Sequence, residues 1–304
     1  MNIKISAVIP TKNRPKDLIK AVKSICNQTR LPEQLVIVDQ SSDNLSKNAV
    51  KLLLQQYKKI KLKYIHNSKI NGLVEAKQYS LKYSSGDIIL FLEDDIILES
   101  EYIKQIVLGF LKNSNMLGCS GIITNQPKKN IIYNLFFFLF HLGIFSDPRM
   151  HLNLKYTGYN NKLVASDKLS GGVSAWRREV FRIIKFDTYS KFHMFEDIDF
   201  STRVFRHFGN RLFINPNARL SHYFSPIGRN TLGEKHRKKI NELFIYYNKR
   251  KDWEWATLSF IWLLLGMFLD AVSQSFIQRS ISPIKGYTLG FIDGLLKKLY
   301  NQNG

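Results

Sequence analysis

The stretch 87–95, Asp-Ile-Ile-Leu-Phe-Leu-Glu-Asp-Asp, joins an apolar run directly to three consecutive carboxylates. Residues 87–92 predict a buried strand, so the sheet would fix the positions of Glu93, Asp94 and Asp95. Carboxylates clustered at a strand end repel one another unless a positive group lies among them. A divalent metal that bridges a diphosphate is such a group, because Mg²⁺ and Mn²⁺ take oxygen ligands. The alternative is a solvated acidic turn that caps the next helix.

The segments before this stretch alternate between strand and helix patterns. The expected strands and helices, in chain order, are 3–9, 15–28, 34–39, 45–57, 61–66 and 72–83. This alternation predicts an α/β fold with a mostly parallel sheet flanked by helices. Ligands of such sheets bind beyond the carboxyl ends of the strands. Asp39 and the acidic triplet both fall there.

The second half of the chain is less regular. Order resumes at 169–181, and the acidic group Glu196-Asp197-Ile198-Asp199 begins a helix that runs to about 207. A strand is expected at 211–214, followed by a segment that ends in His222. A carboxylate at 196–199 could serve as a general base. The alternative is that these acids only stabilise the positive end of the helix dipole.

Net charge and cysteine content limit the function classes. The 304 residues carry a formal charge of +21, which favours nucleic acid, anionic lipid or phosphorylated small molecules as partners. The basic stretch 229–251 stands directly before an apolar run, which indicates the cytoplasmic surface of a membrane. Cys26 and Cys119 are too few for a disulfide framework and predict reduced thiols. Because no dinucleotide fingerprint, P-loop or nucleophile elbow is found, dehydrogenases, NTPases and hydrolases are disfavoured.

Three apolar segments bear on the membrane question. The run 131–145 is too short to span a bilayer and is interpreted as a core helix, a wall of the acceptor site or a membrane-dipping element. The run 253–277 is read as an in-plane helix, a span or a soluble packing helix. Residues 285–300 predict an amphipathic helix. The short apolar start before Pro10 predicts a first strand rather than a signal peptide, so a cytoplasmic location is expected.

A family resemblance emerges from the order of these motifs. They occupy residues 7–14, 36–43, 72–78, 85–87, 91–95, 171–172, 177–178 and 195–197. In that order, over about residues 3–225, the chain resembles the inverting glycosyltransferases of family 2, which have the GT-A fold. The resemblance implies transfer of a sugar from a nucleoside diphosphate sugar to an acceptor hydroxyl, with Mn²⁺ or Mg²⁺ as cofactor. It also implies a glycan or lipid-linked glycan acceptor in surface-polysaccharide assembly.

Site roles also follow from the resemblance. Asp197 would be the catalytic base with Glu196 as runner-up, and Asp95, Glu93 and His222 would hold the metal, with Asp95 nearest to it. Asp39 would contact the nucleobase. The residues expected to bind the donor are Pro10, Thr11, Asn13, Arg14, Asp39, Lys77, Glu93 and Asp94. The chain departs from the common family pattern at Gln40, Glu93 and Lys77-Gln78, so the donor base and sugar are left open.

The expected organisation has three parts. Residues 1–125 form the nucleotide-sugar-binding half of a GT-A domain, 126–228 the acceptor-binding half with the base, and 229–304 the membrane-associated helices. The enzyme is expected at the cytoplasmic side of the cell membrane, held peripherally or by its C-terminal helices to an anionic surface, and not on nucleic acid. Rival readings are a non-catalytic nucleotide-sugar or glycan-binding protein on the same fold and a nucleic-acid-binding protein. A sugar nucleotidyltransferase is a third, although its Gly-rich N-terminal loop is missing.

Overall fold

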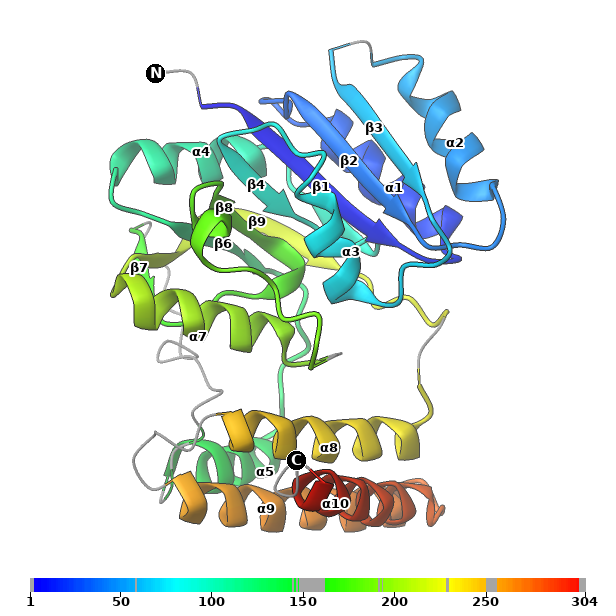
Figure 1. Ribbon diagram of the computed structural model, residues 1–304, viewed down its shortest axis with the longest axis vertical. Helices are drawn as coiled ribbons and strands as arrows, with labels where there is room; N and C mark the ends of the chain where they lie inside the picture. The colour runs from blue at the N-terminus through cyan, green and yellow to red at the C-terminus, as the bar shows by residue number, and fades with distance from the viewer. Residues whose placement is uncertain are drawn as a thin grey trace. The chain divides into compact units, whose positions relative to one another are not determined.

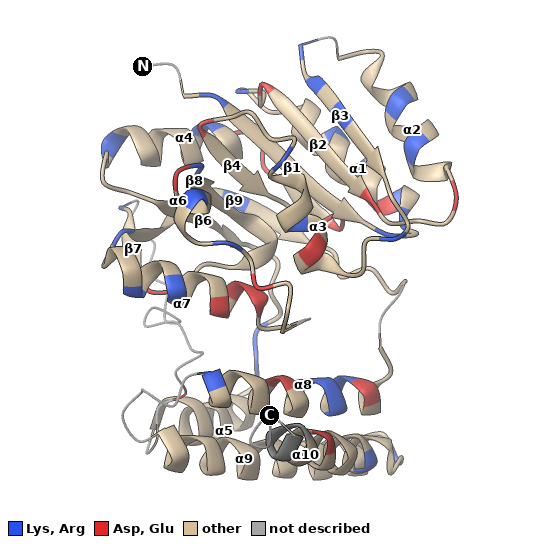
Figure 2. Ribbon diagram, viewed as in Figure 1, with Lys and Arg blue, Asp and Glu red and all other residues tan. Residues whose placement is uncertain are grey.

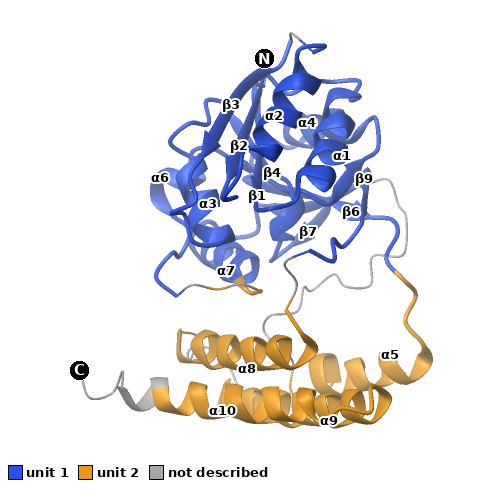
Figure 3. Ribbon diagram, turned by 90° about the vertical axis from the view of Figure 1, so that its right-hand side faces the viewer, with its two compact units in different colours: residues 1–126, 152–191, 196–228 blue, residues 127–151, 192–195, 229–304 orange. Residues whose placement is uncertain are grey.

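A computed structural model of the chain describes residues 3–57, 59–143, 145, 147, 162–190, 192, 194–227, 230–249 and 256–300, with the side chains of 297–300 left out. Parts of the predicted basic stretch 229–251, and the start of the apolar run at 253, lie outside these residues. The chain forms two units (Figure 3). The first contains 1–126, 152–191 and 196–228, and the second contains 127–151, 192–195 and 229–304. The three predicted functional segments remain predictions.

The first unit is built on a mixed sheet (Figure 1). Its parallel part consists of β3 (Lys61–His66), β2 (Gln34–Asp39), β1 (Ile5–Thr11) and β4 (Ile88–Phe91), in that spatial order. The order continues with β8 (Ser174–Arg177), β6 (Gly118–Ile123), β9 (Leu212–His222) and β5 (Ile96–Leu98), while β7 (Val164–Ser166) pairs with β9. The pairings of β8, β5 and β7 are antiparallel. The prediction of an α/β fold is confirmed, with a sheet flanked by helices and parallel strands β1 to β4.

The helices of this unit connect the strands. They are α1 (Pro15–Cys26), α2 (Leu45–Leu54), α3 (Leu73–Ser80), α4 (Tyr102–Lys112), α6 (Val180–Ile183) and α7 (Glu196–Phe208), with the 3₁₀ turn η2 at Gly171–Val173. The first six elements of the chain, from β1 to α3, match the predicted segments closely. The prediction left out β5, α4, β6 and β7. The strand expected at 211–214 is longer, because it passes Pro216 through a register shift and pairs again with β6 from Arg219.

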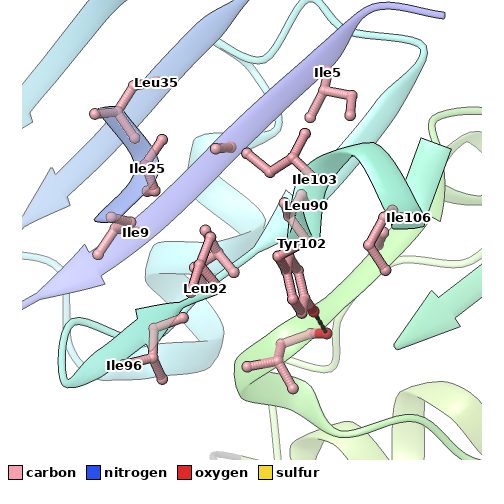
Figure 4. Close-up of a cluster of buried hydrophobic side chains, with 14 of the residues drawn as sticks. Ile5, Ile9, Ile25, Leu35, Leu90, Leu92, Ile96, Tyr102, Ile103 and Ile106 are labelled. Atoms are coloured by element: carbon pink, nitrogen blue, oxygen red, sulfur yellow. Dashed lines mark hydrogen bonds between the residues drawn. The ribbon is translucent and has the colours of Figure 1, made fainter. Parts of the chain in front are cut away.

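The core under the sheet fixes the strand ends that carry polar residues. Figure 4 shows Ile5 and Ile9 of β1 with Leu90 of β4 in one buried cluster, and each of these side chains is fully buried. Tyr102 of α4 lies in the same cluster, and its hydroxyl donates to the carbonyl oxygen of Val173 at 3.0 Å. This bond ties α4 to the turn that holds Gly171 and Gly172.

The second unit is helical. It contains α5 (Ile131–Phe137), a π-helix η1 (Phe138–Gly143), α8 (Leu232–Lys249), α9 (Ala256–Ile277) and α10 (Ser282–Tyr300). The predicted run 131–145 is therefore mostly helical, and the predicted helix 285–300 begins slightly earlier. Among the described residues, α9 is the helix whose length and apolar composition would suffice to cross a membrane.

Glycines on one face of α10 allow it to approach α8 at backbone distance. Gly286, Gly290 and Gly294 recur every fourth residue, so they share a helix face. A Cβ at Gly286 would lie 2.0 Å from the backbone oxygen of Gly233, and one at Gly290 would lie 2.5 Å from that of Arg237. Both distances are far below van der Waals contact, so the two helices pack there without side chains between them.

A side chain at position 290 is expected to destabilise the helical unit. The backbone of Arg237 cannot yield without shifting α8, and overpacking of this kind costs typically about 1–3 kcal/mol. We expect Gly290→Leu to lower the urea midpoint of the helical circular dichroism signal. Thr288→Leu, on the exposed face of α10, is the matched control and should stay near the parent. Equal midpoints for the two variants would contradict the close packing.

Candidate active site

The acidic triplet follows β4 at the edge of the sheet where β1 and β2 also end. The short strand β5 comes directly after it and pairs antiparallel with the end of β9, so that Ile96 lies opposite His222. This pairing brings the neighbouring Asp95 to His222, which is 127 residues away in the chain. Tyr223 N also donates to the backbone oxygen of Asp95 at 2.8 Å. The backbone therefore fixes the distance between the acidic triplet and the histidine.

Glu93, Asp95 and His222 form a group that suits a divalent cation. Nε2 of His222 lies 2.9 Å from Oε2 of Glu93 and 2.9 Å from Oδ1 of Asp95. One ligand atom from each of the three residues lies within 4.8 Å of the other two. Two carboxylates and an imidazole are donors that Mn²⁺ accepts, and carboxylates suit Mg²⁺ as well. The three predicted metal ligands are thus brought together.

The charges in this group support one another. Burial disfavours the imidazolium of His222, but its hydrogen bonds to Asp95 and Glu93 outweigh burial and raise its pKa to about 9. Burial likewise works against the charge on Asp95, yet the bonds from His222 and from Ser225 N lower its pKa. Positive charge among these carboxylates is therefore favourable, as a cation site requires.

Asp94 points away from the metal group toward the loop after β1. Its Oδ2 accepts from Thr11 Oγ1 at 2.7 Å, and its Oδ1 lies 3.0 Å from Arg14 Nη1. Burial raises the pKa of Asp94 to about 6, against the opposing effects of Thr11 and Arg14. Arg14 also lies 3.7 Å from Oδ2 of Asp95 and donates to the carbonyl oxygen of Ile227. Its guanidinium thus links the loop after β1 to both carboxylates.

The rest of this loop is shaped by backbone geometry. Pro10 is buried in β1, opposite Val38 of β2. Asn13 has a positive φ of 56°, a conformation that asparagine tolerates better than most residues. Its backbone N–H donates to Ser41 Oγ at 2.7 Å, which joins the loops that follow β1 and β2. The predicted donor-binding residues from 10 to 14 therefore lie together beside the end of β2.

Asp39 is fully buried at the end of β2. Its Oδ2 accepts from the hydroxyl of Tyr64 at 2.6 Å, and its Oδ1 accepts from Ser41 N at 2.9 Å. The neighbouring Gln40 departs from the usual family acid, and its Oε1 accepts from Gly72 N at the start of α3. Gln40 therefore positions the beginning of α3. The role of Asp39 toward a nucleobase stays a prediction.

The second acidic group lies at the start of α7 (Figure 2). Asp197 Oδ2 accepts from Gly171 N at 2.9 Å, and Oδ1 accepts from Ile198 N at 2.8 Å. Glu196 is buried and lies 3.2 Å from the ammonium of Lys77, which also donates to the carbonyl oxygen of Gly171 at 3.0 Å. Burial and the charge of Glu196 raise the pKa of Asp197, although its backbone bonds and Lys77 act in the opposite direction.

The backbone of Gly171 and Gly172, which carry no side chains, lies between the acidic group at 93–95 and the acidic group at 196–197. A Cβ at Gly171 would lie 2.7 Å from Cβ of Asp197, and one at Gly172 would lie 2.3 Å from Oε1 of Glu93. Glu93 N also donates to the carbonyl oxygen of Gly172 at 2.9 Å. In the sequence, these glycines were recognised only as part of the family resemblance. Their adjacency could also have indicated this packing, because paired glycines often mark a close approach of the backbone to other groups.

Other motif residues stabilise the sheet rather than line this site. Arg177 donates to the carbonyl oxygens of Met116 and Ser114, and Arg178 donates to those of Ser84 and Ser85. A separate set of bonds fixes the turn before β4. Gly86 N donates to Ser6 Oγ, and Lys4 N donates to Asp87 Oδ2.

Lys77, expected to bind the donor, has a buried side chain whose ammonium donates to the carbonyl oxygen of Gly171 and to Oε1 of Glu196. Its role toward the donor stays a prediction. Gln78, the next departure from the family pattern, accepts from Phe186 N at 3.0 Å. Lys77 and Gln78, two of the departures from the family pattern, thus connect α3 to the segments around Gly171 and Phe186.

Comparison with known proteins supports the resemblance. The model of the family described as glycosyl transferase family 2 matches residues 6–183, more than half of the chain. A relative from Escherichia coli, named UDP-Glc:alpha-D-GlcNAc-diphosphoundecaprenol beta-1,3-glucosyltransferase, is 30% identical over 125 residues, covering 40% of this chain and 47% of that protein. A mouse (Mus musculus) protein, named inactive polypeptide N-acetylgalactosaminyltransferase-like protein 5, is 25% identical over 215 residues, covering 67% and 49%. The chain spans about half the length of the curated relatives it matches.

The fold has solved counterparts. One is a mannosyltransferase from Pyrobaculum calidifontis, solved in complex with GDP-Man and Mn²⁺, with a TM-score of 0.61. The similarity covers 99% of this chain and 88% of that one at 14% sequence identity. At this identity the likeness establishes the GT-A-like fold alone.

Proposed function

The chain belongs to glycosyl transferase family 2, and on that premise we propose that it transfers a sugar from a nucleoside diphosphate sugar to an acceptor hydroxyl with inversion at the anomeric carbon. One observation carries this proposal. The cation-suited group of Glu93, Asp95 and His222 is separated from Asp197 only by the backbone of Gly171 and Gly172. An inverting displacement needs a leaving-group site and a base close together.

The donor side would be served by the residues that follow β1, β2 and β4. Glu93, Asp95 and His222 would hold Mn²⁺ or Mg²⁺, which supplies positive charge against the leaving diphosphate when bound. Arg14, whose Nη1 lies 3.7 Å from Oδ2 of Asp95, would add a permanent positive charge beside this group. The Mn²⁺ and GDP-Man bound by the structural neighbour support this assignment.

The acceptor side would be served by Asp197. A hydroxyl is a poor nucleophile at neutral pH, and a positioned base can supply about 10²–10⁴-fold in rate. The two backbone N–H bonds to Asp197 orient its carboxylate, and its raised pKa makes it a stronger base than an ordinary aspartate. Glu196 is held in an ion pair with Lys77, so its proposed role is to position that lysine and to tune Asp197.

The proposed acceptor is a lipid-linked glycan, and the proposed location is the cytoplasmic side of the cell membrane. Two bacterial relatives are named as glucosyltransferases that act on diphosphoundecaprenol-linked or PP-undecaprenol-linked glycans. The apolar helix α9 and the net charge of +21 support attachment to an anionic membrane. Surface-polysaccharide assembly is the process that such an acceptor would serve.

A non-catalytic nucleotide-sugar or glycan-binding protein is the alternative function. It is favoured by the mouse relative whose name describes it as inactive. A screen of purified nucleotide sugars, with donor binding measured by calorimetry beside donor hydrolysis, separates the two. Hydrolysis of one donor with added Mn²⁺ supports the transferase. Tight binding of a donor without hydrolysis or transfer would support the alternative.

The pH dependence of transfer should report the tuning of Asp197. Transfer requires the deprotonated base, so the rate should rise with pH. This rising limb of the pH profile should lie above the ordinary pKa of aspartate, because the pKa of Asp197 is raised. Glu196→Gln removes the like charge that helps to raise this pKa. The limb should therefore move to lower pH, as measured from kcat/KM profiles of parent and variant. An unmoved limb, or a shift to higher pH, would contradict this coupling.

A further inference from the structure

The helical unit exposes apolar side chains along one side of α9. These residues, here called the α9 stripe, are between 39 and 79 % exposed and share one side of the helix, because their positions follow the helical repeat: Leu258, Ile261, Leu265, Phe268, Leu269 and Phe276. The opposite side of α9 is buried in the unit through Ser259, Phe260, Leu263, Leu264, Met267 and Ala271. Because both sides of the helix are apolar, the exposed side is not the polar face of an ordinary surface helix.

Neighbouring helices extend this apolar surface. On α10 the glycine face packs on α8, while Ile292, Leu295 and Leu296 are exposed. The α5–η1 segment is joined to α9 because Trp262 Nε1 donates to the carbonyl oxygen of Leu139 at 2.9 Å. Its exposed apolar residues are Ile131, Ile132, Leu135, Phe138 and Leu139.

Helix α8 has the opposite character and runs along α9. Tyr247 of α8 stacks on Phe260 with ring centroids 4.1 Å apart, and its hydroxyl lies 2.9 Å from Thr257 Oγ1. Toward the other end of α9, His236 of α8 interacts electrostatically with Asp270. The exposed residues of α8 are all charged: Glu234, Lys235, Arg237 and Lys249.

This arrangement decides between the two ways in which α9 could meet a bilayer. With 22 residues it is long enough to span the hydrocarbon core, since a helix rises about 1.5 Å per residue. A spanning α9 would carry the charged side of α8 into the hydrocarbon, where each charge costs about 2.5–3.5 kcal/mol or more. An α9 that lies in the membrane plane keeps α8 in water and places the stripe among lipids.

We propose that the helical unit binds a bilayer as a monotopic element, with α9 in the membrane plane, its stripe in the acyl region and α8 on the aqueous side. Exposed cations flank the apolar surface: Lys128 and Lys129 precede α5, Arg279 lies in the turn between α9 and α10, and Lys285 lies in the first turn of α10. They suit anionic headgroups, as in other interfacial helices. This proposal deepens the proposed membrane location and does not depend on the proposed chemistry.

The first test measures binding to vesicles made of equal parts phosphatidylglycerol and phosphatidylcholine. The full-length double variant Ile261→Glu/Leu265→Glu should bind at least about tenfold more weakly than the parent, because two exposed apolar groups proposed to enter the acyl region are replaced by charges. The matched control is Leu45→Glu/Leu52→Glu on α2, whose leucines are 62% and 69% exposed in the other unit. It should bind like the parent. Equal binding by all three proteins would overturn the proposal.

The second test measures depth. Single cysteines at Leu258, Leu265 and Phe276, and at Lys235 of α8, would carry a fluorophore quenched by lipids brominated at different depths. Labelling of the native Cys26 and Cys119 should be slow, because both thiols are buried and burial raises their pKa values to about 11 and 12. The three α9 positions should share one shallow depth, and position 235 should not be quenched.

Each contrary result has a distinct meaning. A spanning helix would give the deepest quenching at position 265 and shallow quenching at positions 258 and 276. A water-soluble reagent would then reach position 276 only from the side of the membrane opposite to the side to which the protein was added. Loss of self-association on size exclusion in Ile261→Glu/Leu265→Glu, without any vesicle binding by the parent, would show a dimer face. Both results overturn the proposal. Donor hydrolysis measured in the same variants in solution keeps a failure of the proposed enzymatic function separate from a failure of membrane binding.

Discussion

Replacing Asp197 by asparagine is expected to lower the rate of sugar transfer by at least about a hundredfold while donor affinity stays close to that of the parent. Each carboxylate oxygen of Asp197 accepts one backbone N–H, so the amide oxygen of asparagine can keep the bond from Gly171 or the bond from Ile198, but not both. The local fold should persist, because asparagine has nearly the same shape. It cannot take a proton from the acceptor. The measurement is donor affinity by calorimetry beside the transfer rate with the true acceptor.

Two further variants make this result specific. Asp17→Asn on α1 makes the same chemical change at a position far from Asp197 in the sequence, and this variant should transfer sugar at the parent rate. Glu196→Gln should keep most of the transfer rate at high pH, because Glu196 is proposed to tune the base rather than to act as one. If Asp197→Asn transferred sugar at close to the parent rate, the base would lie elsewhere and the mechanism would be wrong.

Asp95→Asn is expected to weaken both divalent-metal binding and turnover, again by about a hundredfold or more in rate, because it removes a negative charge that would hold the cation against the leaving diphosphate. Asparagine has nearly the same shape and can still accept from Ser225 N, so the backbone of 222–225 should remain in place. Excess EDTA should reproduce the loss in the parent, and added Mn²⁺ or Mg²⁺ should restore it. Mn²⁺ affinity is measured directly by electron paramagnetic resonance.

The neighbouring acid provides the matched control. Asp94 bonds to Thr11 and Arg14 rather than to His222, so Asp94→Asn should leave Mn²⁺ affinity within a few-fold of the parent. Full activity of the parent in excess EDTA would contradict a metal-dependent mechanism. Equal loss of Mn²⁺ affinity in Asp94→Asn and Asp95→Asn would instead contradict the assignment of Asp95 as the nearer ligand.

Local sequence pattern was sufficient for the strands that carry the donor side. The apolar runs 34–39 and 87–92 predicted buried strands, and parallel strands necessarily present their carboxyl ends at one edge. Asp39 and residues 93–95 could therefore be placed near each other in advance. The elements that pattern missed include β5, which has only the three residues Ile96–Leu98, and also the longer α4 and β6.

The geometry of the metal group depends on a pairing that local pattern does not encode. Asp95 meets His222 because β5 pairs with β9 across more than a hundred residues. Lys77 and Glu196, which form an ion pair, are also more than a hundred residues apart in the chain. Such contacts follow from tertiary packing, so the sequence supplied candidates while the structure supplied their partners.

The apolar segments show the same limit in another form. Composition identified 253–277 as a membrane candidate, but both sides of α9 are apolar, so no helical period distinguishes the packed side from the exposed one. The tertiary contacts of α9, such as the stacking of Phe260 on Tyr247, show which side is packed. The run 131–145 could not be assigned for the same reason.

The glycine face of α10 has a genetic consequence. Every missense change of a single nucleotide in a glycine codon introduces at least a Cβ. At Gly286 and Gly290 that atom would meet the α8 backbone at 2.0 and 2.5 Å, and at Gly294 it would lie 2.3 Å from the ring of Phe244. No single-nucleotide missense change in these three codons is therefore sterically neutral, whereas substitutions of the exposed Thr288 should be tolerated.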